Sequence, residues 1–80
     1  MLDRALAELR RGNATEALRT LDRYDREFPR GALHPEATAA RVEALVAKGD
    51  RARAKAIAEQ FLAAHPDSPL AHRVRATIDR

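Results

Sequence analysis

The chain has 80 residues, with 15 lysines and arginines, 12 aspartates and glutamates, and no cysteine or tryptophan. This length allows one small domain. The missing cysteine excludes disulfides and thiolate chemistry, and no apolar run approaches the ~20 residues that span a bilayer. Acidic residues are interspersed throughout and leave a net charge of only +3, so we expect a solvated helix surface and no nucleic-acid binding.

A first helix is expected over residues 2–11, because Leu2, Ala5, Leu6 and Leu9 recur at helical spacing on one face. Gly12 follows, as a residue that can adopt the left-handed conformation at a helix end. The pattern starts without a cap, which indicates a piece excised from a longer protein. We expect the apolar face of this helix to favour self-association of the isolated piece.

A second helix is expected over residues 13–28. Asn13 and Glu16 match the capping-box pattern at its start, and Asp22 and Arg26 have the spacing of an i, i+4 ion pair. Proline 29 disfavours helical geometry in the residue before it and ends the helix. The apolar stripe consists of Ala14, Ala17, Leu18, Leu21, Tyr24 and Phe28.

Three further helices complete the pattern, at residues 33–48, 50–65 and 69–79. The third begins at either Ala32 or Pro35 and ends at Gly49, and Asp50 then caps the fourth. Ser68 is the expected cap of the fifth, with proline at its first helical position. Their apolar faces comprise Ala39, Val42, Leu45 and Val46; Ala54, Ile57, Ala58, Phe61 and Leu62; and Leu70, Val74 and Ile78. No segment alternates with period two, so the sequence predicts an all-α fold.

Two stretches of the chain repeat each other with an offset of 37 residues. "GNATEALRTLDRYDREFP" starts at Gly12, and "GDRARAKAIAEQFLAAHP" starts at Gly49. Self-similarity at this period indicates an array of stacked repeats, in which one helix pair cannot bury its apolar face alone.

The residues that match between the two stretches resemble the tetratricopeptide repeat. The two series are Gly12, Ala17, Leu21, Tyr24, Pro29 and Gly49, Ala54, Ala58, Phe61, Pro66. The chain departs from the family in its longer period and in Met1 and Glu8, which stand where Trp and Tyr are typical. The extended junctions "FPRGALHPEA" and "HPDSPLAHRV" are similar to those of bacterial cell-envelope proteins, such as outer-membrane assembly lipoproteins and periplasmic coordinators of wall synthesis.

This resemblance implies a right-handed superhelical stack of antiparallel helix pairs, with repeats at about 1–30 and 31–67 and a capping helix at about 68–80. It implies a non-catalytic scaffold that binds a peptide or partner protein, in the bacterial periplasm or cell envelope, although a cytoplasmic location stays open. The alternative is a sensor or oligomerisation module of a membrane-anchored bacterial regulator.

The family's geometry also implies which residues face a partner, because the first helix of each pair lines the groove. The expected partner-binding residues are Glu36, Ala40, Glu43, Ala47, Arg73 and Ala76. The two glutamates would repel a C-terminal carboxylate, which favours a helix or an extended segment as ligand. The alternative reading is that the alanines only let neighbouring helices approach closely.

Catalytic and metal-binding patterns are missing from the sequence. His34 and His65 each precede a proline at a helix boundary, and no histidine pair has the i, i+4 spacing of a metal site. The sole serine is explained as a helix cap, and the isolated glycines form no phosphate-binding loop. We therefore expect no enzyme activity, no metal and no cofactor.

Overall fold

The structure is a computed structural model that describes residues 1–79. Within this range the chain is all-α, without a strand, and has five helices. They are α1 (Leu2–Arg10), α2 (Ala14–Glu27), α3 (His34–Lys48), α4 (Arg51–Ala64) and α5 (Ala71–Asp79). The expected helices agree with these bounds to within one or two residues at most ends, which is the ordinary uncertainty of helix termini.

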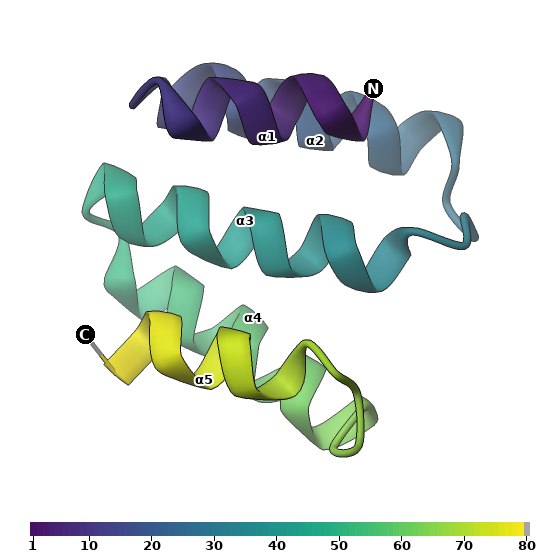
Figure 1. Cartoon of the computed structure of the whole chain (residues 1–80), viewed down its shortest axis with the longest axis vertical. Coiled ribbons are helices and arrows are strands. Elements are labelled where there is room, and N and C mark those ends of the chain that lie inside the picture. The colour runs from purple at the N-terminus through teal and green to yellow at the C-terminus, as the bar shows by residue number, and fades with distance from the viewer. Residues whose placement is uncertain (80) are drawn as a thin grey trace.

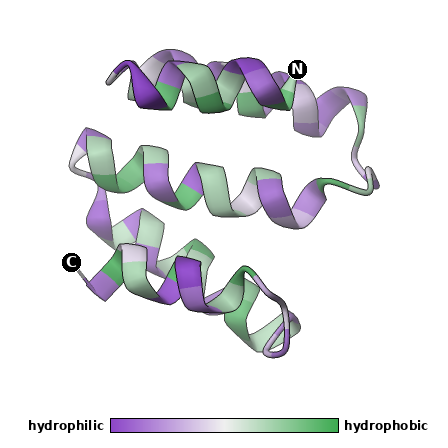
Figure 2. Ribbon diagram, in the orientation of Figure 1, coloured by the Kyte–Doolittle hydropathy of each residue, from purple (hydrophilic) through white to green (hydrophobic). Residues whose placement is uncertain are grey.

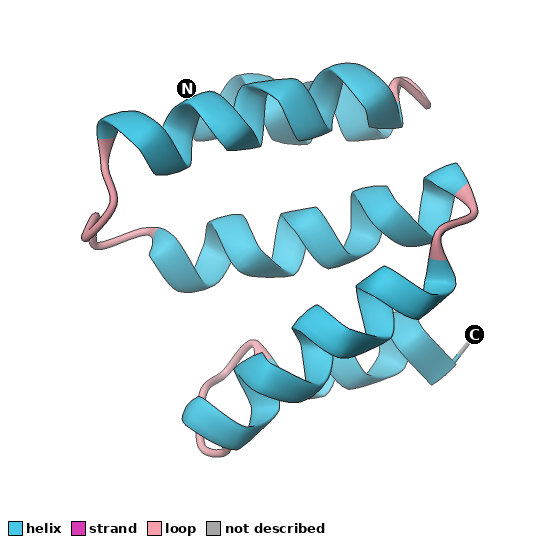
Figure 3. Cartoon of the chain, turned by 180° about the vertical axis from the view of Figure 1, so that it is seen from behind, coloured by secondary structure: helices cyan, strands magenta, loops and turns pink. Residues whose placement is uncertain are grey.

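The helices form a stack in which consecutive helices run antiparallel (Figure 1). Helices α1, α3 and α5 lie on one face of the stack, and α2 and α4 lie on the other, as the view from behind shows (Figure 3). The α1–α2 and α3–α4 turns lie at one edge, and the longer α2–α3 and α4–α5 connections lie at the opposite edge. The stack therefore has two helical faces and two edges made of connections.

Both short turns are closed by the same glycine motif. Gly12 and Gly49 have φ angles of 81° and 95°, a region that residues with a Cβ adopt only at a cost. The amide of Gly12 donates to the Leu9 carbonyl at 3.0 Å, and that of Asn13 donates to the Glu8 carbonyl at 2.8 Å. The same two bonds recur 37 residues later, at Gly49 and Asp50. Each turn is thus a Schellman motif that reverses the chain within a few residues.

The predicted capping box at the start of α2 is wrong. Asn13 occupies the N-cap position, but its side chain makes no cap hydrogen bond. Its backbone N–H is already donated to the Glu8 carbonyl, so the donor that a capping-box glutamate would need is taken. Glu16 instead forms an ion pair with Arg19 at 3.0 Å. The predicted cap at Asp50 is confirmed, because its carboxylate accepts the Arg53 N–H at 3.3 Å.

One expectation at the longer connections needs correction, and a second is confirmed with a small shift of the helix start. Phe28 is 49% exposed, because it lies beyond the last residue of α2 with a non-helical backbone (φ −133°, ψ 62°) and leaves the apolar stripe. Ser68 makes the hydrogen bond of a helix cap, because its hydroxyl accepts the Leu70 N–H at 3.1 Å. A turn at residues 69–70 follows it, and α5 begins at Ala71, two residues later than expected.

The apolar core consists of two clusters that meet at α3. In the first, residues of α1 and α2 pack against Ala37 and Ala40 of α3. In the second, residues of α4 and α5 pack against Ala39, Val42 and Leu45 of α3. Hydrophobic and hydrophilic residues accordingly alternate in patches along every helix (Figure 2). The shared helix ties the two helix pairs into one folded unit.

The glycine turns lead to the first prediction. We expect Gly49→Ala to lower the free energy of unfolding by about 1–2 kcal/mol, because alanine is strained at positive φ. No neighbouring atom lies within 4 Å of the added Cβ, so the loss reports backbone strain alone. Gly49→Asn is the matched control and should recover part of the loss, because asparagine tolerates this conformation. Urea unfolding monitored by circular dichroism measures both, and equal stability of G49A and the unmodified chain would contradict the prediction.

Candidate functional site

Helix α3 presents two opposite polar stripes, one to each face of the stack. Glu36, Ala40, Glu43 and Ala47 follow each other at helical spacing and lie toward α1 and α5. On the opposite side, a second stripe lies toward α2 and α4; it consists of His34, Thr38, Arg41, Leu45 and Lys48. The surface between α1, α3 and α5 is called the front groove below, and the surface between α2, α3 and α4 is called the rear surface.

The front groove contains two hollows. The smaller, of about 120 Å³, has a largely apolar lining of Leu2, Leu6, Ala39, Ala40 and Leu70, with Glu36 and Arg73. The larger, of about 380 Å³, is lined by Leu9, Val46, Ala47 and Thr77, with Arg10 and Glu43. Each hollow thus combines leucine side chains with one glutamate and one arginine.

An ion pair between α3 and α5 separates the two hollows. Arg73 Nε donates to Glu43 Oε1 at 2.9 Å, and the arginine lines the smaller hollow while the glutamate lines the larger one. Both side chains keep contact with solvent, so the pair contributes only about 0.2–1 kcal/mol to stability. The pair bridges α3 and α5 between the two hollows.

The hollows repeat along α3 with a spacing of seven residues. Glu36, Ala39 and Ala40 line the smaller hollow, and Glu43, Val46 and Ala47 line the larger one. Seven residues are two helical turns, and they separate the hollows by about 10.5 Å along the helix axis. The front groove therefore offers two partly apolar sites of different volume at corresponding positions of α3.

The structure places the predicted partner-binding residues unevenly. The residues that line the hollows are Glu36, Ala40, Glu43, Ala47 and Arg73. Ala40 is only 1% exposed, because it packs beneath α1, and Ala76 is exposed on α5 but lines neither hollow.

Sequence reasoning missed that Leu6, Leu9 and Leu70 form apolar walls of the front groove, and that Thr77 also lines it. The sequence predicts the three leucines only as members of apolar helix faces. Two sequence features together could have indicated these residues. The third helix repeats its pattern after seven residues, and the first and fifth helices carry apolar residues on the faces that turn toward it.

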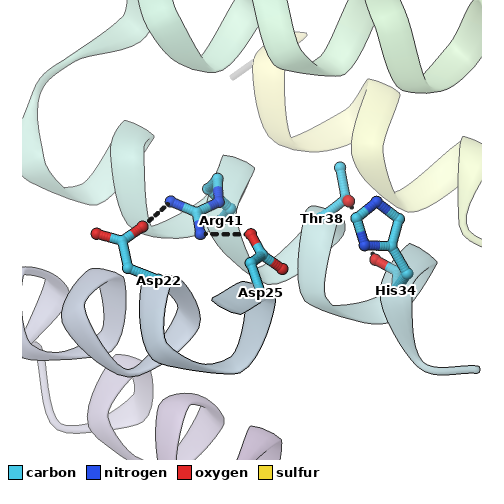
Figure 4. Close-up of polar contacts among 5 residues, drawn as sticks. All are labelled: Asp22, Asp25, His34, Thr38 and Arg41. Atoms are coloured by element: carbon cyan, nitrogen blue, oxygen red, sulfur yellow. Dashed lines mark hydrogen bonds and ion pairs between the residues drawn. The ribbon is translucent and has the colours of Figure 1, made fainter. Parts of the chain in front are cut away.

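The rear surface is dominated by an ion-pair network centred on Arg41. One guanidinium nitrogen donates to Asp22 at 2.8 Å and the other to Asp25 at 2.9 Å, so that α3 is tied to α2 (Figure 4). The Arg41 side chain is 19% exposed, and this partial burial strengthens the pairs relative to a fully solvated contact. Asp22 pairs with Arg41 and not, as the spacing predicted, with Arg26.

The histidines are arranged without a metal-binding constellation. His34 and His65 line one hollow of about 240 Å³ between α3 and α4, whereas His72 lies elsewhere, on α5. Within residues 1–79, no three histidine, cysteine or carboxylate side chains lie together as metal ligands. Over the same range, none of the helices combines the length and apolar character that crossing a bilayer requires.

Comparison with known protein families matches residues 1–75 to the family YfiO, described as an outer membrane lipoprotein. The match therefore covers both helix pairs and most of α5. No curated protein and no solved structure matches the chain significantly.

The Arg41 network leads to the second prediction. We expect Arg41→Met to lower the free energy of unfolding by about 1 kcal/mol, because the two carboxylates lose their shared cation while the apolar stem is kept. Arg19→Met is the matched control, since it removes an exposed ion pair within α2 and should cost at most about 0.5 kcal/mol. Urea unfolding at low and high salt measures both. Equal effects of the two substitutions would contradict the prediction.

Proposed function

Because the chain belongs to the YfiO family of tetratricopeptide-containing outer membrane lipoproteins, we propose that its front groove binds an amphipathic helix of a partner protein. At a coarse level, the family is one of protein-interaction scaffolds. To this coarse function the proposal adds which surface binds and that the ligand is a helix. The observation that carries it is the pair of apolar hollows spaced seven residues apart on α3.

The spacing of the hollows fits a helical ligand. Apolar side chains at positions i and i+7 of a helix lie on one face about 10.5 Å apart, which is the distance between the hollows. Such a ligand would lie along α3 with one anchor in each hollow. Its polar residues between the anchors would face the Glu43–Arg73 ion pair, which offers both signs of charge.

An extended ligand fits the front groove less well. The backbone N–H and C=O groups of an extended segment need partners, supplied by a sheet edge or by side-chain amides. The hollows are lined by neither asparagine nor glutamine, and Arg73 and Glu43 already pair with each other. A helix satisfies its own backbone and needs only the apolar contacts that the groove provides.

The two anchors set the strength of the interaction. Burial of one leucine-sized side chain contributes about 1.5–3 kcal/mol, so two contribute about 3–6 kcal/mol. Lost translational and side-chain freedom offsets part of this, so the two anchors alone support dissociation constants of tens of micromolar at the tightest. The groove alone therefore supports a transient interaction, and tighter binding requires further contact with the partner.

Self-association through α1 stays a prediction. Leu2 is buried against the first core cluster, and Leu6 and Leu9 pack against the same cluster, so α1 exposes less apolar surface than its sequence indicates. Light scattering at several concentrations and two salt levels tests it. The groove proposal requires a monomer, or a dimer that leaves the front groove open.

Location in the cell envelope remains part of this proposal, in keeping with the family.

The third prediction tests the front groove with a defined probe. The probe is a fluorescein-labelled amphipathic helical peptide with leucines at positions i and i+7. We expect Ala47→Arg to weaken its binding about tenfold or more, because the larger side chain fills one hollow and removes one anchor, worth roughly 1.4 kcal/mol or more. Fluorescence anisotropy measures the dissociation constants.

Two controls accompany this test. Ala63→Arg makes the same chemical change at an exposed position of α4 and should leave binding unchanged. A second peptide, with leucines five residues apart, places its side chains on different faces and should bind more weakly. Equal binding of both peptides, or of A47R and A63R, would overturn the proposed ligand geometry.

A further inference from the structure

The edge of the stack that carries the α2–α3 connection has an exposed apolar patch. Among residues 1–79, the most exposed large hydrophobic side chains are Met1 at 44%, Phe28 at 49% and Leu33 at 48%. Phe28 and Leu33 bracket the connection, which appears in Figure 2 as hydrophobic stretches on either side of a hydrophilic tip. The start of the described chain lies at the same edge in both ribbon views (Figures 1 and 3).

The connection holds these side chains in place. The Gly31 N–H donates to the Phe28 carbonyl at 3.0 Å, and the His34 N–H donates to the Gly31 carbonyl at 3.1 Å. The Phe28 ring packs on Tyr24 with centroids 5.4 Å apart. A Cβ at Gly31 would lie 2.8 Å from the Tyr24 hydroxyl and 3.3 Å from the Phe28 carbonyl oxygen, so a larger residue would require Tyr24 or the turn to shift. The apolar groups are therefore presented on two ordered turns.

The second connection shows that the repeat does not require this exposure. Phe28 and His65 occupy the same position of the repeat with nearly the same backbone angles (φ −133°, ψ 62° and φ −135°, ψ 60°). Histidine therefore satisfies the fold where the first connection has phenylalanine. Arg30 is likewise replaced by Asp67. Leu33 is matched by Leu70, which is only partly exposed. The first connection thus differs from its structural counterpart by an exposed phenylalanine and an arginine.

We propose that this edge contacts an anionic phospholipid surface, with Phe28 and Leu33 entering the interface and Arg26 and Arg30 facing the headgroups. Both arginines are exposed and have no ion pair among the described residues. Residues 26–33 contain these two arginines and one acidic residue, Glu27, so their net charge is positive. Apolar side chains combined with basic ones are the pattern that binds such interfaces.

The size of the patch favours a lipid surface over a second copy of the chain. Two half-exposed side chains leave on the order of 200 Å² to bury, far below the ~800 Å² per partner of a stable protein interface. An interface between lipid and water requires no shape complementarity. The chain belongs to a family of outer membrane lipoproteins, so a lipid surface lies near it. The proposed lipid contact does not involve the front groove.

The test uses the absence of tryptophan from the chain. Phe28→Trp places a single fluorophore in the patch, and His65→Trp is the matched control at the equivalent position of the second connection. We expect the emission of F28W to shift to the blue with vesicles of mixed phosphatidylcholine and phosphatidylglycerol, and that of H65W to stay unchanged. Adding Arg30→Asp to F28W should weaken partitioning about tenfold or more, because each charge near an anionic surface accounts for roughly fivefold.

Several outcomes would overturn the proposal. They are an unshifted F28W emission, equal shifts in F28W and H65W, and equal partitioning into pure phosphatidylcholine vesicles. A blue shift that grows with protein concentration in the absence of vesicles would identify a second copy of the chain as the partner and would also overturn it. Because the front groove takes no part in the contact, these outcomes leave the groove proposal untouched.

Discussion

Helix α3 packs against each of the other four helices, and the structure depends on the small side chains that make this possible. Four of its six buried residues are alanines, which permit close approach of neighbouring helices on both sides. Alanine itself removes little area from water, so the larger side chains of the neighbours supply most of the buried surface. Leu21 and Tyr24 do so on one side, and Phe61 and Val74 on the other.

The same packing explains why α3 carries a polar stripe on each face. Its sides are occupied by the two helix pairs, and the two narrow strips between them remain accessible. One strip forms the floor of the front groove, and the other carries Arg41 and its two aspartates. The proposed binding surface and the Arg41 ion pairs therefore lie on one helix without using the same side chains. The proposed lipid contact lies at the connection edge, away from both strips.

The two repeats show how one backbone tolerates different chemistry. Both short turns use the same Schellman hydrogen bonds, which occupy the N–H of the residue after each glycine. The aspartate in the second repeat still caps its helix through its side chain, whereas the asparagine in the first does not. The longer connections have the same backbone angles but carry Phe28 in one case and His65 in the other. The fold needs the geometry of these positions, and their surface chemistry is free to vary.

The sequence by itself determined the helices, their turns and the repeat, because these follow from local periodicity, from glycine at positive φ and from the restriction before proline. It also placed five of the six expected groove residues at the hollows, since helical spacing and the family's geometry assign them to one face of α3 or α5. Only the tertiary structure decided the rest. Asp22 pairs with Arg41 across 19 residues of chain, and Ala40 is buried beneath α1, because both depend on how closely helices distant in sequence approach. The apolar walls of the front groove arise for the same reason, since three separate helices must meet to form each hollow.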